Sequence, residues 1–209
     1  MTVDPKSLLP YANTMAAIYA DDSHPTWQNA TKTAHVWLKR TPDGTLEIYF
    51  EGTTDIEEWM VDVFCIEVPL LDHPKMGPVH AGFAADIAPL LDAIANAVDG
   101  FNYIAIGHSK GGGEVLEFAG EMKDRGHPPT RVIAFEAPRV GTSIMRDYLA
   151  DIDIVQTATR NIHGTDIICQ VPFGPSYVDM RDPLILPVPD SFDIPSKHRM
   201  TGVLAGLNA

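Results

Sequence analysis

Apolar residues follow a helical period in some parts of the chain and a strand-like alternation in others. At helical spacing they predict an entry helix at residues 7–19. Two strands are predicted next, at residues 34–39 and 46–50, and the turn at residues 42–44 between them fits a hairpin or two adjacent strands. The period becomes helical again at residues 55–64. Four apolar side chains share one face of that predicted helix: Ile56, Trp59, Met60 and Val63.

Strands and helices alternate in the second half of the chain. We predict helices at residues 84–98, 112–123 and 143–149, and strands at residues 103–106, 131–135 and 154–159. This order is typical of an α/β fold with a largely parallel central sheet. After Pro172, prolines separate short apolar runs, so we expect extended loops packed on the surface there. The chain is interpreted as one domain, residues 1–209.

Composition and charge narrow the range of functions. Of the 209 residues, 45% are hydrophobic, which is usual for a folded domain and excludes disorder for most of the chain. The 15 basic and 28 acidic side chains give a formal net charge of −13. Nucleic acids and anionic bilayers attract basic surfaces, so we expect no nucleic-acid partner.

The sequence predicts neither a membrane-spanning segment nor an export signal. No run of about 18 uninterrupted apolar residues occurs, and Pro10, Asn13 and Thr14 interrupt the apolar stretch at the start. A cytoplasmic location is the default expectation. The two cysteines, Cys65 and Cys169, are too few for a disulfide scaffold and fit no zinc motif. Two separate buried thiols are favoured over one bridge between them.

The strongest chemical signal is Gly107-His108-Ser109-Lys110-Gly111, between a predicted strand and the helix that follows. In this G-x-S-x-G pattern the serine lies on a sharp turn, where side chains in place of the flanking glycines would clash. The turn places Ser109 at a helix N-terminus, where backbone N–H groups stabilise negative charge. The pattern favours a nucleophilic serine with the Lys110 N–H as oxyanion donor. A glycine-rich turn that serves packing alone is the alternative.

Four sequence blocks together resemble the class 3 lipases. Residues 50–53 with the downstream Trp59 are similar to the family's F-R-G-[ST] block, and residues 79–83 to V-H-x-G-F. Residues 107–112 are similar to G-H-S-x-G-G and residues 137–141 to A-P-R-V-G. The resemblance implies an α/β-hydrolase fold and ester hydrolysis by a Ser, Asp, His triad in that chain order.

The same resemblance implies the other triad positions. The acid is expected after the strand that follows the A-P-R-V-G block, which is where Asp166 stands. Asp151 and Asp153 are competing acids, but both precede that strand. His198 is the only histidine beyond Asp166 in the sequence. The implied triad is Ser109, Asp166 and His198; a loop-capping aspartate and a lone surface histidine are the alternatives.

Further roles follow from the resemblance. Thr53 corresponds to the second oxyanion contributor, and the predicted helix at residues 55–64 corresponds to the lid, although an ordinary core helix fits its pattern equally well. His80 and His108 are expected to hold loops by hydrogen bonds. The length of the chain leaves room for a small lid helix but for no large cap domain. The triad requires no metal or cofactor.

Several residues depart from the family pattern. Glu51 stands in place of Arg, Lys110 in place of Leu and Cys169 in place of Pro. Glu136 stands where the family has Gly or another small residue. The Lys110 ammonium is expected either to favour an anionic substrate or to pair with an acid such as Glu114 or Glu136.

We therefore interpret the sequence as a serine lipase or esterase that cleaves carboxylic esters of lipids, and its negative charge favours neutral or zwitterionic esters. A short-chain carboxylesterase and a phospholipid or cell-envelope acyl hydrolase are alternatives within the same chemistry. A catalytically silent binding or structural protein on the hydrolase scaffold is the alternative outside it. We expect at most transient contact with a lipid surface, and the sequence predicts no oligomeric state.

Overall fold

The computed structural model of the chain describes residues 3–20, 27–30, 34–53, 70–173 and 176–209, and every structural statement below concerns these residues. The predicted lid helix lies outside them. The residues outside therefore include Ile56, Trp59, Met60, Val63 and Cys65.

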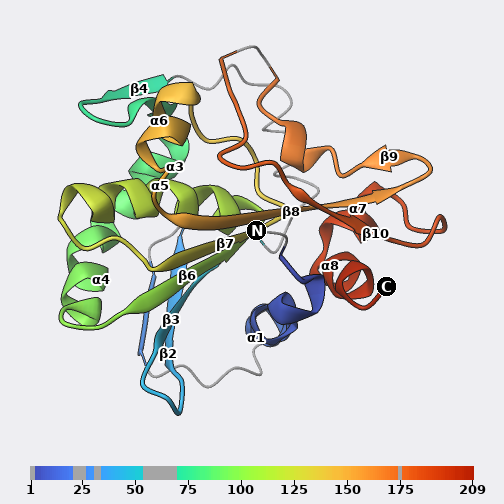
Figure 1. The fold of residues 1–209 in the computed structure, drawn as a ribbon, viewed down its shortest axis with the longest axis horizontal. Helices are drawn as coiled ribbons and strands as arrows, with labels where there is room; N and C mark the ends of the chain where they lie inside the picture. Colours follow the sequence, from blue (N-terminus) through green and yellow to red (C-terminus); the bar gives the residue numbers. More distant parts are fainter. Residues whose placement is uncertain (1–2, 21–26, 31–33, 54–69, 174–175) are drawn as a thin grey trace.

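A twisted central sheet with helices on both faces forms the molecule (Figure 1). Its strands are β1 (Trp27–Ala30), β2 (His35–Arg40), β3 (Leu46–Glu51), β6 (Tyr103–His108), β7 (Arg131–Phe135), β8 (Asp153–Asn161), β9 (Gly164–Thr165) and β10 (Leu184–Pro187). The order is β1-β2-β3-β6-β7-β8-β10, with β9 paired to β8. Neighbours from β3 to β10 are parallel, whereas β2 runs antiparallel to both β1 and β3. The predicted α/β fold with a mostly parallel sheet is confirmed.

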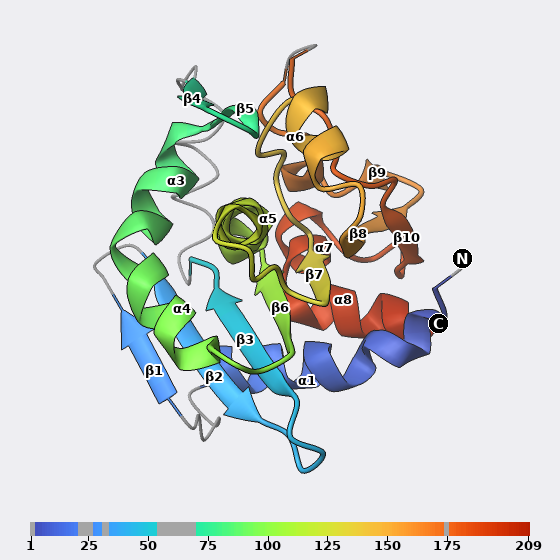
Figure 2. The same ribbon diagram turned by 60° about the vertical axis from the view of Figure 1, so that its left-hand side comes forward.

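Helices cover the two faces of this sheet (Figure 2). On one face lie α3 (Ala81–Ile87), the 3-10 turn η2 (Ala88–Leu90), α4 (Leu91–Val98), α5 (Lys110–Asp124) and α6 (Ser143–Tyr148). On the other face lie the 3-10 turn η1 (Pro5–Leu8), α1 (Leu9–Tyr19) and α8 (Met200–Leu207). A separate hairpin of β4 (Leu70–His73) and β5 (Gly77–His80) precedes α3.

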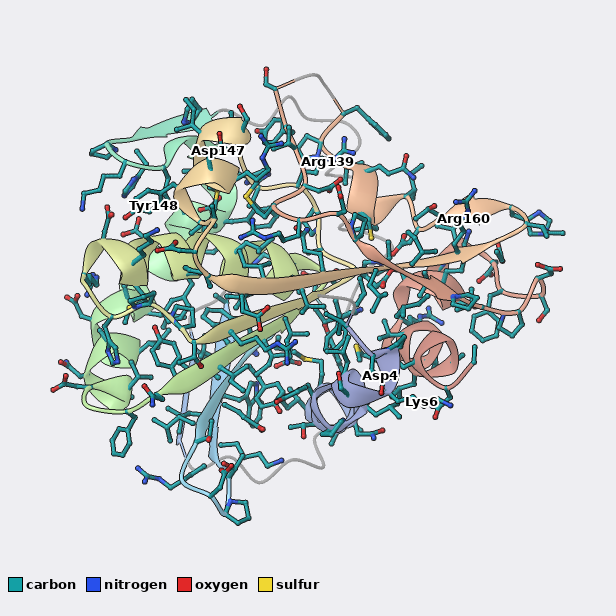
Figure 3. The ribbon with its side chains drawn as sticks, viewed as in Figure 1. Asp4, Lys6, Arg139, Asp147, Tyr148 and Arg160 are labelled. Carbon is teal, nitrogen blue, oxygen red and sulfur yellow. The ribbon has the colours of Figure 1, made fainter. Side chains whose placement is uncertain are left out.

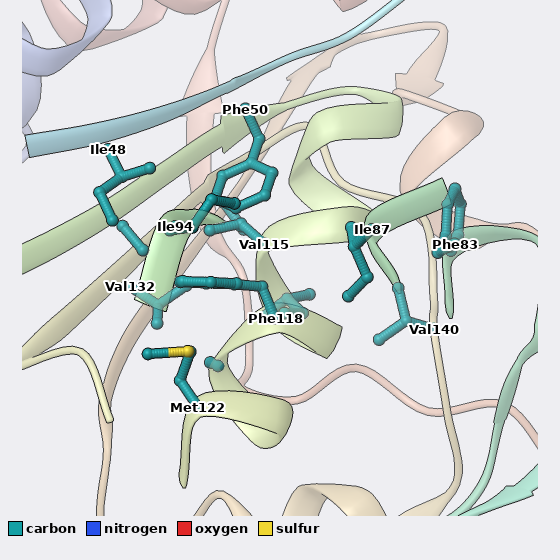
Figure 4. Packing of buried hydrophobic residues seen from close by; sticks show 14 of the residues in the cluster. Ile48, Phe50, Phe83, Ile87, Ile94, Val115, Phe118, Met122, Val132 and Val140 are labelled. Atoms are coloured by element: carbon teal, nitrogen blue, oxygen red, sulfur yellow. The ribbon is translucent and has the colours of Figure 1, made fainter. Parts of the chain in front are cut away.

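The core divides into two clusters because side chains alternate across a strand. Ile48 and Phe50 of β3 lie in the cluster that includes Val115 and Phe118 of α5 (Figure 4). Tyr49, between them, faces the cluster beneath α1 and α8. Both faces of the central strands are therefore buried, which explains their nearly continuous apolar sequences.

The C-terminal region differs from the extended loops expected after Pro172. β10 adds a parallel strand at the edge of the sheet, with Leu184 opposite Thr157 and Pro187 opposite Arg160. Proline is tolerated at the end of an edge strand, where no ladder N–H is required. A short helix, α7 (Ile194–His198), and the buried α8 follow. The expectation of surface loops is therefore wrong for this region.

One described helical stretch, Ala81–Val98, is long and apolar enough to cross a membrane, with a mean hydropathy of 1.3. Its inward-facing residues belong to the core cluster beneath α5: Phe83, Ile87, Leu90, Leu91, Ile94 and Val98. The stretch is broken into α3, η2 and α4, with Pro89 in the 3-10 turn. These contacts are those of an amphipathic helix that packs on a sheet.

Candidate active site

Ser109 occupies a sharp turn between β6 and α5. Its backbone has φ 57 and ψ −125, a conformation that L-residues rarely adopt. A Cβ on Gly107 would come within 2.1 Å of the Gly111 carbonyl oxygen, and one on Gly111 within 2.1 Å of the Phe50 carbonyl oxygen. The flanking positions therefore require glycine, and the turn directs Ser109 to the carboxyl end of the sheet, at the start of α5.

Asp166 and His198 meet at the same end of the sheet. Asp166 follows β9 and His198 ends α7, yet His198 Nδ1 lies 2.5 Å from Asp166 Oδ2. Asp166 Oδ1 accepts a further hydrogen bond of 3.1 Å from the Ile168 N–H. Both side chains are buried, with exposed fractions of 0% and 1%. The contact places the proton of the neutral imidazole on Nδ1 and leaves Nε2 as the basic nitrogen.

Two buried polar atoms at this point have no hydrogen-bond partner among the described residues: Ser109 Oγ and His198 Nε2. A buried polar atom without a partner is costly in a folded protein and needs an explanation. These are the donor and the acceptor between which a Ser, His, Asp mechanism moves a proton. The three residues named by the sequence thus lie on neighbouring elements at one sheet edge, with the Asp166–His198 hydrogen bond formed.

The competing acids lie elsewhere. Asp151 forms an ion pair with Lys123, and Asp153 Oδ2 lies 3.1 Å from Arg131 Nε at the amino end of β8. Parallel strands present their carboxyl ends at one edge, so residues at the start of β8 are distant from the Ser109 turn. Neither aspartate can pair with His198 in this fold.

The loop that holds Asp166 is fastened to the loop after β7. Arg139, labelled in Figure 3, donates from its Nε to Asp179 at 3.3 Å and from a terminal nitrogen to the Gln170 carbonyl at 3.4 Å. Its backbone N–H donates to the Val171 carbonyl at 2.8 Å. Gln170 ends the 3-10 turn η3 (Ile168–Gln170), directly after Asp166. The arginine therefore fixes the segment that carries the acid.

His108 contacts the backbone of His198 and helps to hold it in place. His108 Nε2 lies 2.8 Å from the His198 carbonyl oxygen, and its Nδ1 lies 2.8 Å from Tyr19 Oη. A carbonyl only accepts, so Nε2 carries the proton and Nδ1 accepts from the tyrosine hydroxyl. Tyr19 Oη in turn accepts from the Gly52 N–H at 2.9 Å. Burial lowers the pKa of His108 to about 3, consistent with the structural role expected for this histidine.

The two predicted oxyanion contributors are Thr53 and Lys110. Thr53 follows β3 and lines a cavity together with His198, and Lys110 is the first residue of α5, where backbone N–H groups point toward the helix N-terminus. The Lys110 ammonium lies 2.8 Å from Asp86 and contacts Glu114. Of the two acids considered from the sequence, Glu114 is therefore a partner, whereas Glu136 has other contacts.

Lys110, Asp86, Glu114 and Glu117 form what we call the Lys110 cluster. Glu114 and Glu117 are buried on α5, with exposed fractions of 0% and 1%. Burial raises the pKa of Glu114 to about 7, and Lys110 opposes that shift. Burial and the neighbouring acids hold the pKa of Glu117 well above its usual range. The ammonium is engaged by acids of its own chain, so this geometry gives no support to an anionic substrate.

A cavity of about 390 Å³ lies beside His198, between α1 and α8. Its lining consists mostly of apolar or weakly polar side chains: Ala16, Tyr19, Ala20, Thr53, His108, His198, Arg199, Met200, Thr201 and Leu204. This volume is within the range of small-molecule sites. The cavity therefore adjoins both His198 and one predicted oxyanion contributor, Thr53.

The sequence model of one protein family, lipase (class 3), matches residues 47–175, which is more than half of the chain. The chain belongs to the class 3 lipase family. No curated protein sequence gives a significant match to it.

Solved structures of fungal proteins, two of them named as lipases, share the fold of this chain. The lipase–propeptide complex of Rhizomucor miehei has a TM-score of 0.72 at 17% identity, covering 89% of this chain and 70% of that chain. The Lip2 lipase of Yarrowia lipolytica has a TM-score of 0.61 at 19% identity, covering 77% of this chain and 64% of that chain. The N225Q variant of MDLA from Penicillium cyclopium has a TM-score of 0.67 at 15% identity, covering 83% of this chain and 67% of that chain. The chain thus spans 64% of the Yarrowia protein, and the likeness establishes the α/β-hydrolase fold.

A second buried group, which we call the Asp166 cluster, consists of Asp166, His198, Glu136 and Cys169. Burial lowers the pKa of His198 to about 4, so the imidazole is a neutral base near pH 7. Burial raises the pKa of Asp166 to about 6, and hydrogen bonds from the Ile168 N–H and the Glu136 side chain oppose that shift. Donor atoms of Glu136, Asp166 and Cys169 lie within 4.8 Å of one another. Their oxygens are already engaged by protein donors, so we interpret the group as a hydrogen-bonded cluster and not as metal ligands.

Two contributors to the site were not identified from the sequence. Tyr19 precedes the catalytic blocks by many residues, and nothing in its local pattern separates it from an ordinary helix residue. Glu136 was visible as a departure from the family pattern, but its contact with the acid depends on how β7, β8 and the loop after β9 are arranged. Cys169 is a free, buried thiol in the structure.

Proposed function

We propose that this class 3 lipase is a serine ester hydrolase that cleaves lipid esters. The observation that supports it most is the 2.5 Å contact between buried Asp166 and His198 beside a strained serine at a helix N-terminus. His108 offers a comparison within the same fold. Both of its ring nitrogens have partners, whereas His198 keeps Nε2 for chemistry.

In the proposed mechanism Ser109 Oγ attacks the ester carbonyl carbon while His198 Nε2 takes its proton. Asp166 stabilises the imidazolium that forms. The Lys110 N–H and Thr53 stabilise the oxyanion, and the imidazolium returns the proton to the leaving alcohol. Water, deprotonated by His198, then attacks the acyl-enzyme and releases the acid.

The apolar cavity favours an ester with a hydrocarbon acyl group. Ala16, Met200 and Leu204 line it, and it opens next to His198. The net charge of −13 and the internally paired Lys110 favour neutral or zwitterionic esters over strongly anionic surfaces. A short-chain carboxylesterase is the second candidate, because a cavity of this size also admits short esters.

Labelling with a fluorophosphonate tests the proposal directly. We expect one covalent adduct per chain, lost in Ser109→Ala and retained in Ser143→Ala, which removes an exposed serine at the start of α6. A p-nitrophenyl ester series from acetate to palmitate then separates the candidates, since kcat/KM should rise with acyl length for a lipid ester hydrolase. Folded wild-type protein that takes no label would refute the enzyme and favour a silent binding protein.

A further inference from the structure

Glu136 is a buried carboxyl on strained backbone next to the triad acid. It follows β7 with φ 48 and has an exposed fraction of 0%. A residue with a Cβ in this left-handed region costs about 1 kcal/mol relative to glycine. Burying its carboxyl adds a desolvation cost. Strain and burial together at a site edge point to a role for this side chain.

The hydrogen bonds around Glu136 indicate where its proton lies. Oε1 is 3.0 Å from Thr157 Oγ1, and Oε2 is 2.8 Å from the Thr159 N–H and 3.2 Å from Thr159 Oγ1. Thr159 Oγ1 is also 3.0 Å from the Lys197 carbonyl oxygen, which only accepts. The threonine hydroxyl has one proton to donate. The single proton of a neutral Glu136 cannot serve both Thr159 and Asp166, so Thr159 Oγ1 donates to Glu136 Oε2 and leaves the Glu136 proton for Asp166.

The contact with Asp166 indicates which of the two carboxyls carries the proton. A hydrogen bond between two carboxyl groups needs a proton on one of them, and two buried carboxylates within 4.8 Å repel each other. Asp166 already accepts from His198 and from the Ile168 N–H, which favours its ionised form. The proton therefore belongs to Glu136. Burial and the charge of Asp166 raise the pKa of Glu136 to about 8.

The other groups that face Glu136 do not supply a positive charge near neutral pH. Cys169 Sγ lies 3.6 Å from Oε2, and burial with the nearby acids raises the pKa of its thiol well above the usual range. His198 is neutral in the resting site. Lys197 on α7 directs its ammonium to the Gly164 carbonyl at 3.1 Å and to Asn161 Oδ1 at 3.5 Å. Lys197 acts on Asp166 instead.

We propose that Glu136 is a positioning residue for the triad acid, holding the one proton that it shares with Asp166, and that release of this proton to solvent makes His198 a stronger base. The proposal rests on the proposed function, because it concerns how that site works. When Glu136 is neutral, Asp166 accepts a hydrogen bond from it, and this hydrogen bond weakens the stabilisation of the His198 imidazolium by Asp166. With ionised Glu136, that hydrogen bond is lost and a second negative charge stabilises the imidazolium of the transition state.

The pH profile of kcat/KM tests this, with p-nitrophenyl butyrate from pH 5 to pH 10. For the wild type we expect a second rise of about three- to tenfold, centred near pH 8, above the plateau set by His198. Glu136→Gln should lack this rise. Its amide oxygen can accept from the Thr159 N–H and its NH₂ can donate to Thr157, so KM should stay near the wild-type value. Glu117→Gln removes a different buried carboxyl and should keep the rise.

A glycine variant at position 136 provides a second test in case Glu136→Gln does not fold. Glu136→Gly removes the carboxyl and relieves the strain at φ 48, so it should fold and should also lack the alkaline rise. A wild-type profile that is flat above pH 7, or a rise that persists in both variants, would overturn the proposal.

A second readout separates this proposal from the proposed function. In protein labelled with ¹³C at the glutamate carboxyls, the resonance absent from Glu136→Gln should titrate near pH 8. That titration in a protein without esterase activity would uphold the shared proton and refute the hydrolase. Esterase activity in a protein whose Glu136 is already ionised at pH 6 would uphold the hydrolase and refute the shared proton.

Discussion

The Lys110 cluster and the Asp166 cluster flank Ser109, and each buries several carboxyls. In the Lys110 cluster an ammonium lies 2.8 Å from Asp86 and contacts Glu114. In the Asp166 cluster the basic group is a neutral imidazole, and no ammonium among the described residues contacts Glu136. In the Lys110 cluster an ammonium therefore compensates the charge of Asp86 and Glu114, whereas in the Asp166 cluster a proton neutralises Glu136.

The pKa shifts of Glu114 and Glu136 follow this difference. Burial raises the pKa of Glu114 to about 7 against the opposing charge of Lys110, whereas burial and Asp166 both raise the pKa of Glu136 to about 8. A fixed ammonium stabilises structure, since its charge does not change during turnover. A proton beside Asp166 can be lost, so under the proposed mechanism the charge of the Asp166 cluster is the one that would affect chemistry.

The largest expected effect is a difference in kcat between variants of the two clusters. Asp166→Asn should lower kcat by about 10⁴-fold, because an amide cannot stabilise the imidazolium and favours the wrong tautomer. Glu114→Gln makes the same change of atoms in the Lys110 cluster and should leave kcat within about threefold. Steady-state kinetics on p-nitrophenyl butyrate measure both. Equal losses in the two variants would show that the clusters are not functionally distinct.

The second prediction separates the clusters by stability. Lys110→Met should lower the free energy of unfolding by about 3–5 kcal/mol at pH 8, because it leaves Glu114 and Asp86 without their cation. The loss should shrink at pH 5, where Glu114 is protonated in the folded state. Arg125→Met breaks the exposed pair with Asp92 and should cost less than about 1 kcal/mol. Urea denaturation at the two pH values gives these numbers, and a pH-independent loss for Lys110→Met would contradict the ion-pair explanation.

The part of the site that the sequence could predict is local. The G-x-S-x-G spacing encodes the turn, because Gly107 and Gly111 are confined by backbone atoms 2.1 Å from any added Cβ. Asp166 and His198 were reached through chain order and family resemblance, which carry information on the fold. The Lys110 contact with Glu114 is an i, i+4 pair on one helix and was readable for the same local reason.

The part that could not be predicted depends on contacts between distant segments. Asp86 reaches Lys110 from α3, and Glu136 reaches Asp166 across the β7–β8 pairing and the loop after β9. No periodicity in the sequence reports such contacts. The C-terminal strand is hard to predict for another reason. Pro183 precedes β10 and Pro187 ends it, and a high proline content favours loops, although an edge strand tolerates a proline at its end.

The smallest expected effect concerns Glu117, the buried member of the Lys110 cluster that follows Glu114 on α5. Its Oε1 is buried without a hydrogen-bond partner among the described residues, and burial with the nearby acids holds its pKa well above the usual range. A carboxyl whose pKa is raised on folding binds its proton more tightly in the folded state. Its contribution to stability is therefore fully present below the pKa of the unfolded chain and is lost as the pH rises toward the folded pKa.

Glu117→Gln keeps the shape and removes this titration. We expect the variant to match the wild type near pH 4.5 and to exceed its free energy of unfolding by about 1–3 kcal/mol at pH 8. Urea denaturation over this range measures the difference. A variant that is less stable than the wild type by the same amount at every pH would mean that Glu117 is held by a hydrogen bond that glutamine cannot make. In that case each cluster would contain a carboxyl whose proton is needed for stability. The two clusters would then differ in one respect, the Lys110 ammonium.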